Sequence, residues 1–187
     1  SIQSLSESAF ASEQTGDART ALYRFGIVAS LLPDDSKLWS GIARAALKIT
    51  PNADEASTLQ QAAVSASMNA YQTSRTVSDR AEALNLLGQS LDRRQDGRPA
   101  LEAFKLSLEL ANSETVQAAF ADARGRHGFR VVGNTVDPDA ETPRACVQFS
   151  EDLTDADYTT FVTLDGAAHL DLRRSLVMVE SRFPSEA

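Results

Sequence analysis

The sequence predicts a mostly α-helical protein with a β-rich C-terminal end. Over residues 1–127, apolar residues recur at spacings of three and four, which is typical of amphipathic helices. At His127-Gly128-Phe129 this rhythm gives way to short runs in which apolar and polar residues alternate, as they do in strands. Small and aromatic residues also recur at matching places in the helical part, which indicates a repeat. We therefore expect a helical repeat domain over 1–127 and a β segment over 128–187.

Size and charge restrict the possible functions. The 187 residues, 42% of them hydrophobic, fit one sizeable domain or two small ones. The sequence contains no run of about 18 apolar residues, which is the length needed to cross a bilayer. The formal net charge of −8, without a cluster of Lys and Arg, argues against nucleic acid as a partner. Because the chain starts at Ser1 without a leader-like segment, we expect a processed chain or an excised piece.

The first helices of three expected hairpins are aligned by a small residue near their middle. Ala9, Ala43 and Gly88 hold this position. Trp39 precedes Ala43 by four residues and adds to the apolar face of the second of these helices. Small residues at this position allow a neighbouring helix to approach closely.

The second helices of the first and third hairpins match each other in the same register. Ala21 and Phe25 in the first correspond to Ala100 and Phe104 in the third. We expect each phenylalanine to fill the groove between hairpins, and Pro33 to end the second helix before the next hairpin begins. Together these residues resemble the tetratricopeptide repeat over roughly residues 2–127, in a degenerate form. The resemblance implies a stack of helical hairpins, an α-solenoid.

The middle hairpin has a longer second helix. It is predicted to run from a cap at Asn52, with Glu55 three residues on, to about Gln72. One face is rich in alanine and is predicted to pack internally, although a docking face for a partner is the alternative. The residues of this face are Ala56, Leu59, Ala63, Ala66 and Ala70.

A final single helix is expected over 114–126, capped by Ser113. We expect the strands to cover the end of the stack, because a solenoid needs a closing element. Phe120 and Phe129 are the predicted contacts at this domain junction. The inward residues of the helix are Val116, Ala119, Phe120 and Ala123.

The β segment is expected to begin with a strand at 129–132, followed by a turn at Gly133-Asn134. A second strand is expected from Arg144, with Ala145, Val147 and Phe149 on one face. Two further strand candidates lie at 161–164 and 176–180.

Residues 129–153, and above all 143–153, resemble the first β-sandwich strands of bacterial alpha-2-macroglobulin family proteins. The resemblance implies a partial immunoglobulin-like or macroglobulin-like sandwich after the helical repeats. It also implies a non-catalytic interaction module of a bacterial envelope protease inhibitor, located in the periplasm, with a protease or an envelope protein as partner. Cys146 lacks the neighbouring Glu-Gln pair of a thioester motif, so we interpret it as a small buried residue.

A second interpretation is a tetratricopeptide scaffold or adaptor that binds a peptide or an envelope protein. This role requires that a concave groove lined by Asn, Lys or Arg survives folding. An incomplete sandwich would leave an unpaired strand edge, so a homodimer through that edge is also possible.

No catalytic, cofactor or metal site is expected, and the chain is not predicted to be an enzyme. The two histidines, His127 and His169, do not combine with a nucleophile and an acid, and His127 is interpreted as a helix C-terminal residue. Asp137, Asp139 and Glu141 lack the spacing of a calcium loop, and Pro138 indicates a turn there.

Overall fold

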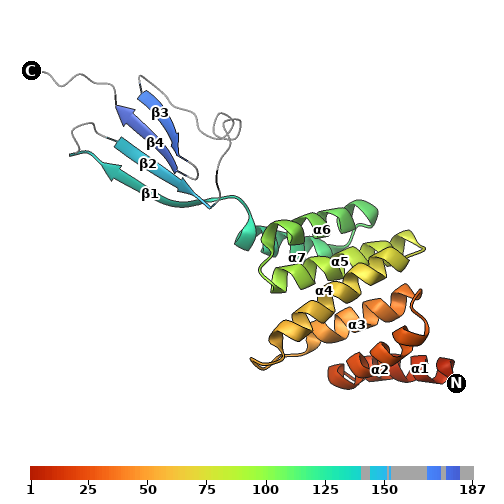
Figure 1. The fold of residues 1–187 in the computed structure, drawn as a ribbon. Coiled ribbons are helices and arrows are strands. Elements are labelled where there is room, and N and C mark those ends of the chain that lie inside the picture. Colours follow the sequence, from red (N-terminus) through yellow and green to blue (C-terminus); the bar gives the residue numbers. More distant parts are fainter. Residues whose placement is uncertain (140–143, 151, 153–167, 174–175, 182–187) are drawn as a thin grey trace, which may run out of the picture. The chain divides into compact units, whose positions relative to one another are not determined.

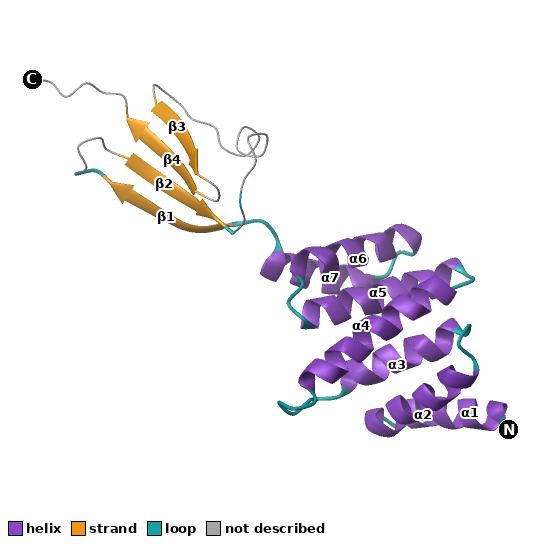
Figure 2. Ribbon diagram, in the orientation of Figure 1, coloured by secondary structure: helices purple, strands orange, loops and turns teal. Residues whose placement is uncertain are grey.

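The computed structural model describes residues 1–139, 144–150, 152, 168–173 and 176–181. The chain divides into two compact units, Ser1–Gly128 and Phe129–Ala187. The first unit is helical and the described part of the second is a β-sheet (Figures 1 and 2). Each unit is described by itself below.

Seven helices form the first unit. They pair in sequence as three hairpins followed by a single helix, and each helix contacts the next. The first helices of neighbouring hairpins also contact one another, so α1, α3, α5 and α7 follow one side of the stack. None of the described helices has the length and apolarity needed to span a membrane. The helices are α1 (Ile2–Gln14), α2 (Ala18–Leu31), α3 (Ser36–Lys48), α4 (Ala56–Thr73), α5 (Val77–Arg93), α6 (Gly97–Leu110) and α7 (Glu114–His127).

The turns within the first and third hairpins each contain one left-handed residue. Gly16 has φ +80° in the first turn, and the Asp17 carboxylate then accepts a hydrogen bond from the Thr20 backbone N–H at 3.1 Å to cap α2. In the third hairpin the left-handed residue is Gln95, at φ 67°, while Gly97 is the first residue of α6. The third hairpin therefore turns without a glycine at its left-handed position.

Helix α4 begins at Ala56, later than the predicted cap at Asn52. The Glu55 backbone N–H donates to Asn52 Oδ1 at 2.9 Å, and the Asn52 N–H donates to Glu55 Oε1 at 3.1 Å. This reciprocal pair has the logic of a capping box, but it closes a turn that precedes the helix. Arg19 of α2 also binds the Glu55 carboxylate at 2.5 Å, and this bond lowers the pKa of Glu55 to about 2. The predicted internal face of α4 is buried at Leu59, Ala63, Ala66 and Ala70.

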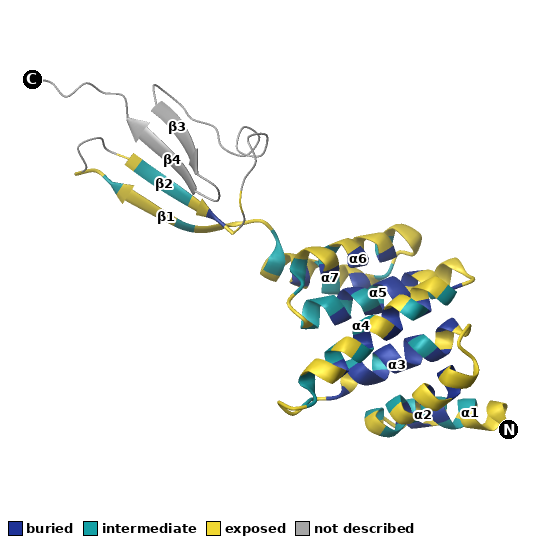
Figure 3. Cartoon of the chain, viewed as in Figure 1, coloured by how far each residue is buried: buried dark blue, intermediate teal, exposed yellow. Residues whose placement is uncertain are grey.

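The core of the helical unit is built around two phenylalanines that lie on glycines. Phe25 is fully buried, and a Cβ added at Gly41 of α3 would lie 2.7 Å from its ring. Phe104 is 1% exposed, and a Cβ added at Gly88 of α5 would lie 2.7 Å from its ring. Figure 3 shows the buried residues concentrated along the inner sides of the helices. Close approach of the helices thus depends on residues without side chains.

Helix α7 has the predicted cap, since Ser113 Oγ accepts from the Val116 N–H at 3.5 Å. Val116 and Ala123 are buried against Phe104, and Phe120 packs beside them partly exposed. The helix ends at His127, one residue after the predicted end of the helix at Arg126, and His127 is its C-terminal residue, as interpreted from the sequence.

The described strands form one antiparallel sheet with the order β1-β2-β4-β3. A bulge between Val131 and Gly133 shifts the register of β1 against β2, so that Val131 lies opposite Phe149 and Val136 opposite Ala145. Phe129 stacks on Phe149 with ring centroids 5.1 Å apart. The strands are β1 (Val131–Asp137), β2 (Arg144–Phe149), β3 (Ala168–Arg173) and β4 (Leu176–Ser181).

The sheet corrects several predictions. The first strand starts later than predicted and continues through Gly133-Asn134, because pairing with β2 extends over both residues instead of a turn. β3 was not predicted, whereas β4 confirms the candidate at 176–180. The described strands make a single sheet and no second layer, so they do not form the expected sandwich. Cys146 is half-buried, not buried.

Two predictions remain without a test. The strand candidate at 161–164 lies outside the described residues, as does Glu141. Phe120 packs within the helical unit and Phe129 within the sheet unit. Their predicted mutual contact at the junction stays a prediction.

Candidate functional site

Arginines join the first helices of the hairpins along one side of the stack. Arg44 of α3 binds Glu13 of α1 through Nε at 2.6 Å and through a second nitrogen at 3.1 Å. On its other side Arg44 also pairs with Glu82 of α5. Because the Arg44 side chain is only 28% exposed, this bridge is better shielded than most surface ion pairs. Three successive first helices are therefore held together by one guanidinium group.

A second arginine caps the end of α3. Arg93 of α5 donates to the carbonyl oxygens of Leu47 and Ile49 at 2.8 Å, and to that of Ala46 at 3.3 Å. The last carbonyls of a helix lack partners within the helix and carry partial negative charge. A guanidinium group with several donors satisfies them from the neighbouring hairpin.

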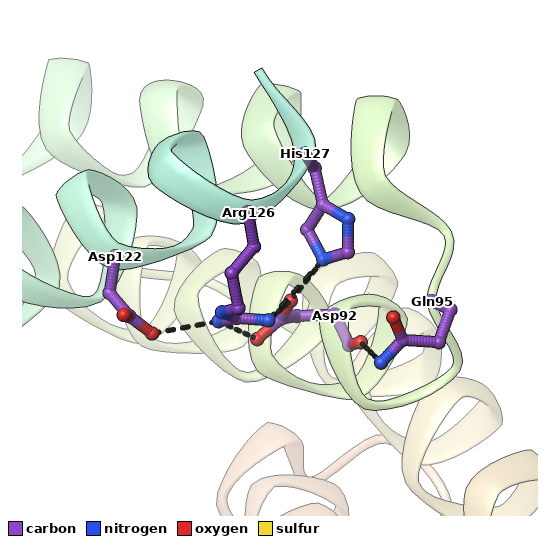
Figure 4. A network of polar contacts seen from close by, with 5 residues as sticks. All are labelled: Asp92, Gln95, Asp122, Arg126 and His127. Atoms are coloured by element: carbon purple, nitrogen blue, oxygen red, sulfur yellow. Dashed lines mark hydrogen bonds and ion pairs between the residues drawn. The ribbon is translucent and has the colours of Figure 1, made fainter. Parts of the chain in front are cut away.

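A third arginine ties α7 to α5 (Figure 4). Arg126 binds the Asp92 carboxylate with two parallel hydrogen bonds of 2.7 and 2.8 Å, and it also binds Asp122 at 2.8 Å. His127 Nε2 lies 2.8 Å from Asp92 Oδ1, the oxygen that also accepts the 2.7 Å hydrogen bond from Arg126. The bonds from Arg126, with a smaller contribution from His127, hold the pKa of Asp92 below its ordinary value.

Gly97 makes room for this cluster. A Cβ added at Gly97 would lie 2.5 Å from the Cβ of His127 and 2.6 Å from its ring. Only glycine therefore allows the start of α6 to pass this close to the end of α7. Gly97 thus leaves the space that the His127 side chain occupies.

A groove of about 420 Å³ lies among α3, α5 and α7, beside these ion pairs. We call it the α5 groove. Its apolar lining comes from Leu47, Phe104 and Ala119, and its polar lining includes Gln89, Arg93 and Arg126.

Gln89 is a polar residue of the groove with hydrogen-bonding capacity to spare. Its Nε2 donates to Asn85 Oδ1 at 3.1 Å, one turn earlier on α5. Among the described residues, no further hydrogen-bond partner is found for Gln89 Oε1 or for Asn85 Nδ2. Both side chains are half-buried. Each amide therefore retains one group that can bind a ligand.

Two larger hollows lie elsewhere on the helical unit. One of about 590 Å³ is formed mainly by the connections before α3 and before α5. The other, of about 530 Å³, lies along α1. Neither is lined by α3, α5 and α7 together, as the α5 groove is. The described residues contain no group of three or more side chains that could hold a metal ion.

The repeat residues singled out in the sequence lie in the core. Pro33 is exposed, in the connection between α2 and α3, and its carbonyl accepts from Trp39 Nε1 at 2.7 Å. Trp39 is half-buried against the first core cluster. Phe104 is the repeat residue that also reaches the α5 groove. The buried members are Ala9, Ala21, Phe25, Ala43, Gly88, Ala100 and Phe104.

Sequence reasoning singled out Phe104 and Ala119 but missed the polar residues that line the groove. The repeat register contains a signal for one of them, since Gln89 directly follows the aligned small residue Gly88, as Arg44, outside the groove, follows Ala43. Leu47 and Asp92 follow the same two residues by four positions. These four residues lie beside the aligned small residues at which the helices pack closely, so they lie on the same side of the stack.

One solved structure relates this architecture to a known fold. The crystal structure of the Sgt2 TPR domain from Aspergillus fumigatus is similar to the helical part. The match covers 67% of this chain and 78% of the Sgt2 chain, with a TM-score of 0.55 and 16% sequence identity. The helical part has a tetratricopeptide-like fold. At this level of identity the similarity shows the fold alone. No protein-family model matches the sequence, and no curated protein does.

The Asp92 cluster leads to a prediction about the docking of α7. Asp92→Asn is expected to lower the free energy of unfolding of the helical unit by about 1 kcal/mol at pH 7, because Arg126 and His127 lose their shared carboxylate. Since the folded pKa is lowered, the stabilisation is present above the unfolded pKa of about 3.9 and is lost as the pH falls through the folded value. Urea unfolding followed by circular dichroism should therefore show a smaller difference from wild type at pH 3 than at pH 7.

Asp122→Asn is the matched control. Asp122 pairs with the same Arg126 but is 73% exposed, so its loss should have a smaller effect. Equal effects of the two substitutions would show that the Asp92 cluster does not secure α7.

Proposed function

We propose that the helical unit is a non-catalytic protein-interaction scaffold that binds an extended segment of a partner protein in the α5 groove. The tetratricopeptide-like fold supports a protein-interaction role in general. The groove supplies a specific place for it, because residues of four helices line it and apolar and polar side chains are combined there.

The observation that carries the proposal is the unused hydrogen-bonding capacity of Gln89, which lines the groove, and of its partner Asn85, one turn earlier on α5. The arginines around the groove are already engaged, Arg93 with the α3 carbonyls and Arg126 with two aspartates. An amide pair offers a donor and an acceptor, which match the C=O and N–H groups of an extended peptide backbone. The floor of Phe104 and Ala119 would then receive an apolar side chain of that peptide.

This proposal corresponds to the scaffold interpretation of the sequence. The macroglobulin-type protease inhibitor and the envelope location rest only on the resemblance of residues 129–153 together with the helical repeats before them, and no comparison lends them support. The sheet unit offers a separate candidate contact, self-association through a strand edge, which is independent of the α5 groove.

The proposal is tested by selecting random peptides of about 12 residues on the immobilised chain and measuring the affinity of enriched peptides by calorimetry. Gln89→Ala should weaken their binding about tenfold, which corresponds to the loss of one or two hydrogen bonds to the peptide. Ala119→Leu should weaken it as well, because the larger side chain fills the apolar floor.

Gln61→Ala is the matched control. Gln61 lies exposed on α4, where its side chain binds Ser65, so the same chemical change should leave peptide affinity unchanged. If no peptide is enriched, the scaffold proposal fails. If peptides bind equally well to Gln89→Ala and Ala119→Leu, the α5 groove is not the binding site.

A further inference from the structure

Strand β1 is an edge of the described sheet. In the order β1-β2-β4-β3, it pairs with β2 along one side and with no other described strand. The other side of an edge strand presents backbone N–H and C=O groups that can pair with another strand. β1 is seven residues long, which is enough for a ladder of several hydrogen bonds.

The side chains of β1 give this edge little protection. Proteins commonly protect exposed edges with Lys, with Pro within the strand or with charges near its centre. β1 has none of these, because its one charged residue is Asp137 at the end. Val131, Val132 and Val136 are 54%, 51% and 70% exposed. The bulge after Val131 is the one protective feature within the strand.

We propose that two copies of this chain associate through their β1 strands, which pair antiparallel about a two-fold axis at Asn134. A two-fold axis necessarily places identical strands antiparallel, so the edge must be complementary to itself. With Asn134 opposite its own copy, Val132 lies opposite Val136 of the second copy. Asp137 then lies beside Arg130 of the second copy, so residues of opposite charge meet at each end of the ladder.

This charge pattern is why a second copy is the expected occupant. The centre of β1 is uncharged. Asp137, at the end of β1 in one copy, meets Arg130, which directly precedes β1 in the other copy. Asp137 is already close to Arg144 of β2, at 3.5 Å, so the approaching arginine would add to an existing pair. The exposed valines are buried at both ends of the same ladder.

The test uses the full chain and two variants of opposite charge. Sedimentation equilibrium up to about 0.1 mM should show a monomer–dimer equilibrium for the wild type. Asn134→Lys and Asn134→Asp should each raise the dissociation constant about three- to tenfold, because like charges then face each other across the axis. An equimolar mixture of the two variants should recover the wild-type affinity, because Lys then faces Asp.

Gln148→Lys is the matched control, because it adds a charge at an exposed position of the central strand β2 and should leave the equilibrium unchanged. Recovery in the mixture also proves that both variants fold. A wild type that stays monomeric, a dimer that neither variant weakens, or a mixture that fails to recover would each overturn the proposal. None of these outcomes depends on the α5 groove.

Discussion

Phe104→Ala is expected to lower the free energy of unfolding of the helical unit by about 3–5 kcal/mol. Phe104 is 1% exposed and belongs to the cluster that joins α6 to α7, with Val116 and Ala123. Its ring lies directly on Gly88, so truncation leaves a cavity next to a helix backbone that cannot fill it with a side chain. Urea unfolding followed at 222 nm reports this transition, because the helices dominate that signal.

The matched control for this prediction is Leu106→Ala, two residues away on the same helix. Leu106 is 39% exposed, so its truncation removes less buried surface and should cost about 1 kcal/mol or less. If the two substitutions cost the same, Phe104 is not the central packing residue of the third hairpin.

The helical repeats could be predicted because their signal is local. Ala21 and Phe25, like Ala100 and Phe104, follow the helical period, and this period determines which face of a helix is buried. The phenylalanines lie between successive elements of the stack, as predicted. Phe25 lies on Gly41 of the next hairpin and meets Phe10 of its own edge to face at 5.0 Å. Phe104 packs on Gly88 of its own hairpin and also against Val116 and Ala123 of α7.

The polar contacts of the candidate site could not be predicted, because their partners lie far apart in the chain. Arg44 reaches Glu13 and Glu82, which belong to the hairpins before and after its own. Arg93 binds backbone carbonyls of α3, and these leave no mark in the sequence. Such contacts depend on which helices become neighbours, and a single sequence with a degenerate repeat does not specify this.

The strands were predictable only where alternation was regular. Ala145, Val147 and Phe149 alternate with polar residues or Cys146, and β2 forms there. In β1, Gly133-Asn134 carries a strong local turn preference that pairing with β2 overrides. The bulge also shifts the pairing of Val131, which lies opposite Phe149, relative to the rest of β1. The burial pattern of β1 therefore does not alternate with a period of two, which is the pattern that predicts a strand from sequence.

Gly88→Leu is expected to destabilise the helical unit by about 1–3 kcal/mol, even though leucine favours helix more than glycine does. The new Cβ would lie 2.7 Å from the Phe104 ring, which is too close for a carbon contact, so the ring or α5 must move. Combined with Phe104→Ala, the leucine enters space that the ring has left. The double variant should therefore lose about 1–3 kcal/mol less than the sum of the two single losses, as measured by a double-mutant cycle.

Gly26→Leu separates this packing effect from helix propensity. Gly26 is exposed in the interior of α2, and a Cβ added there meets no atom within 4 Å. The same substitution should stabilise the unit at this position by up to about 1 kcal/mol, because it removes the entropic cost of a helical glycine. The two positions thus predict opposite signs for one chemical change. If Gly88→Leu is also stabilising, or if its effect simply adds to that of Phe104→Ala, the close contact between α5 and the Phe104 ring does not hold the third hairpin together.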